Sequence, residues 1–116
     1  MEFTDSLKLN YEFRRAYRKG RSVAEPCLVI YARRNGKAVN RLGFTVSNKL
    51  GCAVVRNRVR RKLREIYRLN ESRLCRGHDV VVVARSRSVG ADYHRLEREF
   101  IEACAGLGLL KRENET

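Results

Sequence analysis

The chain has 116 residues and a formal net charge of +13, with 26 Lys and Arg residues against 13 Asp and Glu residues. Because 43% of the residues are apolar, the chain can build one modest core, and we expect a single domain over residues 1–116. No apolar run approaches the roughly 20 residues that a membrane-spanning helix needs, and the opening residues lack a signal-peptide core. The composition therefore predicts a cytoplasmic protein with a polyanionic partner, nucleic acid before an anionic membrane surface.

The first predicted element is a helix over "YEFRRAYRK", residues 11–19. Asn10 is its expected N-cap, and Gly20 is placed where a left-handed C-terminal cap would lie. Phe13 and Tyr17 stand four residues apart on one face of this helix. Together with Tyr31, they either stack on unpaired nucleotides or pack in the core, and the pattern leaves both alternatives open.

Two strands are expected next. "PCLVIYAR" reads as a strand, the turn "RNGK" (34–37) has the Asn-Gly pair that hairpins prefer, and "RLGFTVS" (41–47) is expected to return as the hairpin partner. The segment "GRSVA" before them is a candidate for one more short strand. Side chains alternate across a strand, so one face carries Cys27, Val29 and Tyr31 and the other carries Leu28, Ile30 and Ala32. Since both faces are apolar, we expect cover on both.

The stretch "AVVRNRVRRKLREIYR" (53–68) belongs to a second helix, expected from about Cys52 to Leu69. At about 100° per residue its apolar side chains form one stripe. Arg60 and Arg64 border that stripe on one edge, and Arg58 and Lys62 border the other. A solvated face usually mixes charges of both signs, whereas this stretch sets one acid against seven bases, which favours nucleic-acid binding.

Arg56 falls inside the apolar arc of this helix. Its guanidinium could meet a phosphate near the helix N-terminus, or its stem could run over the core with the head in water. The residues alone leave both alternatives open.

"DVVVVAR" (79–85) has the continuous apolar pattern of a central strand. A last amphipathic helix follows over "DYHRLEREFIEACAGL", with Asp92 as N-cap and an end near Gly106 and Gly108. We expect an ordered core over residues 7–107 and a frayed tail over 108–116. Taken together, these helices and strands predict an α+β sandwich of about four strands and three helices.

The sequence offers little for catalysis. Metal-dependent nucleases need several converging carboxylates, and no paired pattern of Asp or Glu occurs. His78 and His94 are isolated and read as turn or surface residues, and the four cysteines lie more than twenty residues apart, without metal-ligand spacing. We expect no catalytic residue and no metal site, and interpret the chain as a binder.

"RNRVRRKLRE" (56–65), preceded by "GFTVSNKLGCAVV" and followed by "GHDVVVVAR", closely resembles the bacterial ribonuclease P protein component. The resemblance covers about residues 7–104, including "NYEFRRAYRKGR" and "LVIYAR". It implies a left-handed βαβ crossover around the basic helix, as in the second domain of ribosomal protein S5. The sequence departs from the family pattern in two places. Many members begin with a basic run that ends in Arg-Leu, whereas Ser6 and Leu7 occupy that place here, and Asn48 stands at a position that is often basic.

The resemblance further implies that the chain is part of a ribonucleoprotein endonuclease, a hydrolase of tRNA processing. In this enzyme a catalytic RNA cleaves the 5′ leader from precursor tRNA. Mg²⁺ would be held mainly by that RNA, and no obligate protein partner or membrane is implied. By position, the residues implied to bind the RNA subunit are Arg56, Asn57, Arg58, Arg61, Lys62 and Lys49. Those implied to bind the precursor tRNA leader are Phe13, Tyr17, Val29, Tyr31, Arg60 and Arg64.

Two rival hypotheses come from other classes of protein. A ribosomal-type structural protein would bind rRNA and have no role in tRNA processing. A sequence-specific DNA binder would need a helix-turn-helix with base-reading Asn or Gln, and the sequence has no convincing one.

Overall fold

The structure, a computed structural model, describes residues 1–111. The elements in chain order are β1 (Thr4–Ser6), α1 (Asn10–Lys19), β2 (Arg21–Ala24), β3 (Leu28–Arg34), β4 (Asn40–Thr45), α2 (Ala53–Asn70), β5 (His78–Ala84) and α3 (Tyr93–Gly106). The α+β class is confirmed, although residues 1–111 form five strands instead of about four, because β1 is too short to leave a pattern in the sequence. None of the helices in this range is long and apolar enough to cross a membrane.

The five strands form one sheet in the order β1-β4-β5-β3-β2. The predicted hairpin of β3 with β4 is wrong, because β5 lies between them, antiparallel to β3 and parallel to β4. An Asn-Gly turn indicates a local reversal of the chain and not which strands pair. Val80, Val81 and Val82 are at most 2% exposed, and a strand buried on both faces belongs in the middle of a sheet. The antiparallel hairpin partner of β3 is the short strand β2.

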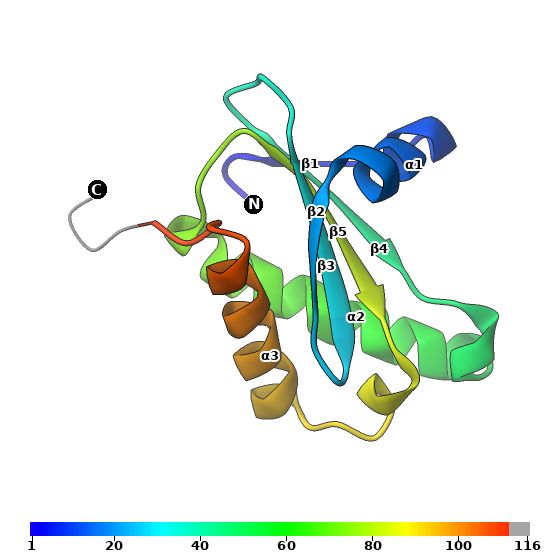
Figure 1. Cartoon of the computed structure of the whole chain (residues 1–116). Coiled ribbons are helices and arrows are strands. Elements are labelled where there is room, and N and C mark those ends of the chain that lie inside the picture. The colour runs from blue at the N-terminus through cyan, green and yellow to red at the C-terminus, as the bar shows by residue number, and fades with distance from the viewer. Residues whose placement is uncertain (112–116) are drawn as a thin grey trace.

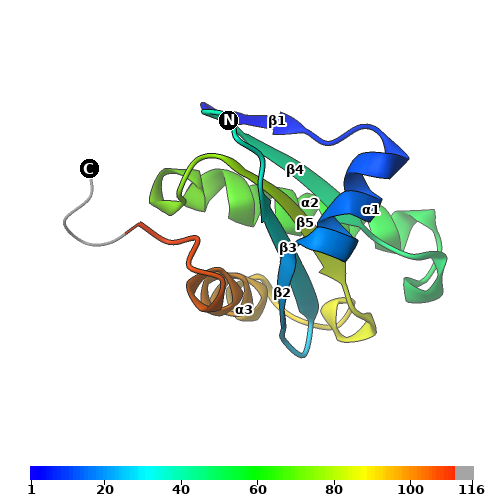
Figure 2. The same cartoon turned by 45° about the horizontal axis from the view of Figure 1, so that its top comes forward.

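Helices cover the sheet on both faces (Figures 1 and 2). α2 and α3 pack on one face around the main apolar core, which includes Leu28, Ile30 and Phe100. α1 crosses the opposite face, where Ala16 packs with Val81 in a smaller cluster. α2 links the neighbouring parallel strands β4 and β5 from behind the sheet, and the crossover in Figure 1 is left-handed.

The ends of α1 differ from the prediction. Asn10 lies inside the helix, and the first turn is closed by Glu12, whose carboxylate accepts a hydrogen bond from the backbone N–H of Leu9 (3.0 Å). Gly20 has a φ of −81° and is not a left-handed cap. A glycine is required there for another reason, since a Cβ would lie 2.4 Å from the carbonyl oxygen of Ala16 and 2.8 Å from that of Ala32.

The packed part of the chain is longer than the expected 7–107. Glu71 accepts hydrogen bonds from the backbone N–H groups of Glu2 (2.8 Å) and Phe3 (3.3 Å), which fastens the segment before β1. Leu109 is 2% exposed, and Leu110 forms a bridge to Leu74. The rest of the expected tail, 112–116, lies outside the described residues.

The predicted alternation along β3 fails only at its start. Cys27 precedes the strand and joins the core under α2 and α3, instead of sharing the face of Val29 and Tyr31. Its backbone N–H donates to the carboxylate of Glu99 on α3 (2.7 Å), which turns this residue toward that helix.

Candidate nucleic-acid interface

α2 turns an apolar side to the sheet and a basic side to solvent. Val59, Leu63, Ile66 and Tyr67 are at most 3% exposed, which confirms the predicted stripe. Four arginines at the opposite side are exposed: Arg58, Arg61, Arg64 and Arg68.

The one acid of α2 is engaged at the C-terminal end of the helix. Glu65 accepts two hydrogen bonds from Arg68, at 3.1 and 2.5 Å. The other cations of α2 make no ion pair with any residue of 1–111. No acid within residues 1–111 therefore offsets the repulsion between these cations, and a polyanion bound to the solvent-facing side of α2 would relieve it.

The sheet edge beside α2 is open. β1 pairs with β4 only as far as Ser6 and Leu42, after which the chain leaves the edge and turns into α1. The following residues of β4, Gly43 to Thr45, therefore have β5 on one side and no strand on the other. α1 stands on one face of this edge and α2 on the other (Figure 2). Side chains of both helices line the hollows at this edge.

Two adjoining hollows lie along this edge. The larger has about 600 Å³ and brings together Phe13, Tyr17, Phe44, Thr45 and Arg60, with Asn10, Arg14 and Val46. The second, of about 360 Å³, shares Phe13, Phe44 and Arg60 and adds Arg64, Leu42, Gly43 and residues of the N-terminal segment. We call the two hollows together the edge cleft. A surface of aromatic rings with cations at its rim suits unpaired nucleotides, because rings stack on bases and cations meet phosphates.

The aromatic residues of the cleft hold one another in place. The ring of Tyr17 meets that of Tyr31 edge-on, with 4.9 Å between centroids. The Tyr17 hydroxyl is hydrogen-bonded to the hydroxyl of Thr45 (2.6 Å). Tyr31 therefore supports Tyr17 from the sheet, whereas Val29, half-buried on the same strand, lines neither hollow.

Four of the six predicted leader residues thus converge on the edge cleft, and Tyr31 reaches it through Tyr17. Sequence reasoning missed Phe44 and Thr45. One signal for them was present: a glycine inside a strand often marks a close approach, and a Cβ on Gly43 would lie 2.5 Å from ring carbons of Phe13. The aromatic ring lies on the strand backbone at this point.

The residues predicted to bind the RNA subunit differ in their exposure and in their contacts with the fold. Arg58 and Arg61 are exposed on α2, and Lys49 is exposed in the turn before it. Asn57 accepts a hydrogen bond from Arg60 (2.9 Å), so it joins the two predicted sets, and both residues line a hollow of about 190 Å³ with Arg61 and Arg64.

The other two members of that set are partly engaged with the fold. Arg56 is half-buried, with its Nε enclosed and lacking a hydrogen-bond partner, which agrees with a stem that packs over the core. Lys62 donates to the carbonyl oxygen of Ala91 (3.4 Å).

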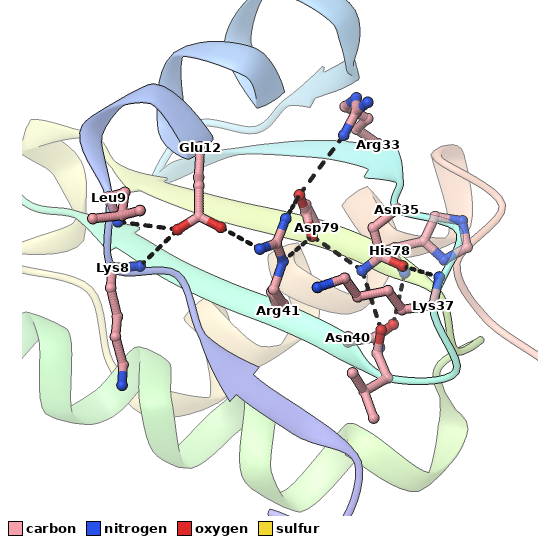
Figure 3. A network of polar contacts seen from close by, with 11 residues as sticks. Lys8, Leu9, Glu12, Arg33, Asn35, Lys37, Asn40, Arg41, His78 and Asp79 are labelled. Carbon is pink, nitrogen blue, oxygen red and sulfur yellow. Dashed lines mark hydrogen bonds and ion pairs between the residues drawn. The ribbon is translucent and has the colours of Figure 1, made fainter.

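A polar network that the sequence did not predict holds α1 against the sheet (Figure 3). Arg41 on β4 donates to both carboxylate oxygens of Asp79 on β5, at 2.9 and 2.8 Å, and also pairs with Glu12 on α1. Asn35 donates to Asp79 as well (3.0 Å). Glu12 lies next to Phe13 in the chain, so the network fixes the helix that carries the aromatic residues of the cleft.

Both carboxylates of the network are held ionised. The backbone N–H of Leu9 lowers the pKa of Glu12, and the charge of Arg41 adds to this against the effect of burial. Burial acts to raise the pKa of Asp79, but hydrogen bonds from Arg41 and Asn35 outweigh it and hold this pKa below its usual value. Within residues 1–111 no three His, Cys, Asp or Glu side chains are grouped so that they could hold a metal ion.

The family model described as ribonuclease P matches residues 1–108 of this chain. The chain is also 44% identical over 107 residues to the ribonuclease P protein component of Natranaerobius thermophilus, which covers 92% of this chain and 93% of that protein. The chain belongs to the bacterial ribonuclease P protein family. The ribonuclease P protein component of Caldanaerobacter subterraneus is 50% identical over 96 residues, covering 83% of this chain and 82% of the relative.

Solved ribonuclease P proteins have the same fold. The protein from Staphylococcus aureus superposes with a TM-score of 0.84 at 31% identity, covering 91% of this chain and 97% of that one. The protein from Thermotoga maritima gives 0.78 at 29% identity, covering 84% and 93%. The resemblance carried by the "RNRVRRKLRE" segment and its neighbours is therefore confirmed at the level of family and fold.

Proposed function

We propose that this ribonuclease P protein binds a catalytic RNA through the outward side of α2 and holds the 5′ leader of precursor tRNA in the edge cleft. It would thereby promote removal of the leader in tRNA 5′ maturation in the cytoplasm. The observation that carries the proposal is the convergence of Phe13 and Tyr17 from α1 with Arg60 and Arg64 from α2 beside the open edge of β4.

The edge cleft suits a single strand better than a duplex. Its aromatic rings are accessible only to bases that are free of partners, and base stacking on an aromatic side chain contributes about 1–3 kcal/mol. Arg60 is oriented by Asn57 (2.9 Å), so its guanidinium has less freedom to lose when it meets a phosphate. These features support discrimination between precursor and mature tRNA, which differ in a single-stranded leader.

The outward side of α2 suits a large structured RNA. Arg58 and Arg61 are exposed and, within residues 1–111, unpaired with any acid. They lie on the helix away from the apolar stripe, with Lys49 in the turn that precedes it. Phosphate contacts of this kind position an RNA without reading its sequence.

Chemistry at the scissile bond belongs to the RNA in this proposal, with Mg²⁺ held mainly by RNA phosphates. When bound, Mg²⁺ would supply charge stabilisation and an activated water. The protein's part is to supply cations that reduce the repulsion between the two RNAs, and aromatic rings that position the leader.

Reconstitution tests the proposal. The protein alone should not cleave precursor tRNA, whereas its addition to the catalytic RNA at low Mg²⁺ should restore leader removal. A structural protein of the ribosome would restore nothing, so absence of stimulation contradicts the proposal. Cleavage by the protein without RNA would contradict it equally.

Substitutions separate the two surfaces. Arg58→Gln with Arg61→Gln should weaken assembly with the RNA subunit and lower the log–log salt slope by about 1–2 units, roughly one for each phosphate that is no longer neutralised. Tyr17→Ala should leave assembly unchanged and weaken the binding of precursor tRNA that has a leader. An equal loss for leaderless tRNA would remove the cleft assignment.

A further inference from the structure

α1 has an outward face that neither the core nor the edge cleft explains. Five exposed residues follow one another along it at helical spacing, and they line a hollow of about 260 Å³: Tyr11, Arg14, Arg15, Arg18 and Lys19. We call this the outer face of α1. It lies on the opposite side of the sheet from α2 and α3 (Figure 2).

The four cations of the outer face are uncompensated. None of them makes an ion pair with any residue of 1–111. The one acid of α1 is Glu12, which is buried and directed to Arg41 on the sheet (Figure 3). Like charges therefore stand four residues apart at Arg14 with Arg18 and at Arg15 with Lys19, an arrangement that destabilises a helix in the absence of an anion.

The helix dipole accounts for the position of only two of these four cations. Cations in the last turn, here Arg18 and Lys19, are stabilised by the carbonyl groups at the C-terminus. Arg14 and Arg15 lie in the middle of the helix, where this effect has faded. α3 offers a comparison within the same protein, because its exposed Arg98 and Glu102 have opposite signs, as ordinary solvated faces do.

An aromatic ring lies among these cations. Tyr11 is 51% exposed, and the guanidinium of Arg15 sits over its ring at 5.4 Å from the centroid. A ring braced by a cation and open to solvent is a surface on which an unpaired base can stack. A duplex keeps its bases inside, so the ring favours single-stranded RNA over a helical one.

The outer face is continuous with the edge cleft. Arg14 lines both the hollow of the outer face and the larger hollow of the cleft, where Tyr17 and Thr45 also lie. A strand that leaves the cleft past Arg14 thus meets the further cations of the outer face.

We propose that the outer face of α1 binds single-stranded RNA that emerges from the edge cleft, namely leader nucleotides farther from the cleavage site than those the cleft holds. This inference rests on the proposed function and extends the leader path from the edge of the sheet across α1. It assigns RNA-binding roles to Tyr11, Arg15 and Arg18.

The test measures the affinity of the reconstituted holoenzyme for precursor tRNAs with stepwise longer leaders. The variant Arg15→Gln with Arg18→Gln neutralises the outer face and leaves Arg14 in place. Arg87→Gln with Arg98→Gln is the matched control, since it removes two exposed arginines elsewhere on the surface. Both pairs are exposed, and circular dichroism checks that both variants fold.

The outer-face variant should bind long-leader precursors about fivefold or more weakly, with a salt slope lower by about 1.4 units, from two phosphates at ~0.7 each for a single strand. The outer-face variant should bind short-leader precursors and the RNA subunit with the affinity of the wild type. The control variant should have wild-type affinity for every RNA. Tyr11→Ala should show the same dependence on leader length.

Three results would overturn the inference. If the outer-face variant matches the wild type at every leader length, α1 does not contact the distal leader. If it loses affinity equally for short leaders, or for the RNA subunit itself, the cations serve another RNA contact. If the wild type gains no affinity from any leader, the proposed function of the cleft fails, and this inference fails with it.

Discussion

The sharpest test of the edge cleft is the substitution Gly43→Ala. Gly43 lies in β4, where the ring of Phe13 rests on the strand. An added Cβ would lie 2.5 Å from both Cε1 and Cζ of Phe13, and 3.3 Å from the Cβ of Leu7. Carbon atoms in contact are about 3.5–4.0 Å apart, so the ring must move by roughly an ångström or more. Its way out leads into the cleft, since Phe13 lines both hollows.

The cost of this displacement follows from the packing. Inserting a methyl group into a filled site costs about 1–3 kcal/mol, while Gly→Ala at a position of ordinary backbone conformation gains about 0.4–1 kcal/mol through the unfolded chain. We expect a net destabilisation of about 1–2 kcal/mol in urea unfolding. Gly90→Ala is the matched control, because a Cβ there meets nothing within 4 Å and its φ is not in the left-handed region.

The functional measurement is the affinity of the reconstituted holoenzyme for precursor tRNA with and without its leader. Gly43→Ala should lower the leader-dependent part of the affinity by about tenfold, close to the loss of one base stacked on an aromatic ring. Assembly with the RNA subunit should be unchanged, because α2 is not displaced. If Gly43→Ala and Gly90→Ala have the same stability and the same leader dependence, Phe13 does not form the floor of a leader site.

Asp79→Asn should destabilise the protein by about 2 kcal/mol in urea unfolding, because Arg41 loses the charge of one of its two buried carboxylate partners and keeps only Glu12; a change below about 1 kcal/mol would contradict the role given to this pair. The same network predicts that the protein loses stability in acid, because folding lowers the pKa of Asp79. The contribution of ionised Asp79 to the free energy of unfolding is complete above the unfolded-state pKa of about 3.9, and it is lost as the pH falls below that value toward the folded-state pKa. The stability of Asp79→Asn should therefore depend less on pH over that range. Gly20→Ala should be among the most destabilising changes in the chain, because its Cβ would meet backbone oxygens of Ala16 and Ala32 that cannot move aside; thermal unfolding near that of the wild type would refute this. Thr45→Val should free the hydroxyl of Tyr17 and weaken leader binding severalfold without affecting binding of mature tRNA, and an equal effect on both would contradict it.

Most patterns that depend on neighbouring residues were predicted correctly from the sequence, with the two ends of α1 as exceptions. The apolar stripe of α2 follows from helical spacing, and residues such as Val59 and Leu63 are buried as the wheel predicts. The N-cap Asp92 accepts a hydrogen bond from the backbone N–H of Arg95 (2.8 Å), as its position indicated. In these places one interaction within a few residues determines the structure.

Features that depend on residues far apart in the chain were not predicted from the sequence. The Asn35–Gly36 turn carries no information on whether β4 pairs with β3, since the competing strand β5 lies about forty residues later. Likewise, Glu12, Arg41 and Asp79 are separated by 29 and 38 residues, and nothing in their local patterns marks them as partners. The open edge of β4 depends on the early end of β1, a strand of three residues without a periodic signal.

The placement of the acids explains how a fold with so many bases presents them outward. Glu12 and Asp79 meet at Arg41, Glu71 binds backbone N–H groups near the N-terminus, and Glu99 binds Cys27 and Arg95. These acids are buried and serve the fold, so they do not offset the exposed arginines of α1 and α2. The helices on opposite faces of the sheet thus both present cations, and side chains of both line the hollows at the open edge of β4, where the aromatic rings lie. In the proposed function, an RNA strand drawn to either helix by charge would therefore be led to the edge cleft, where bases could stack beside arginines from both helices.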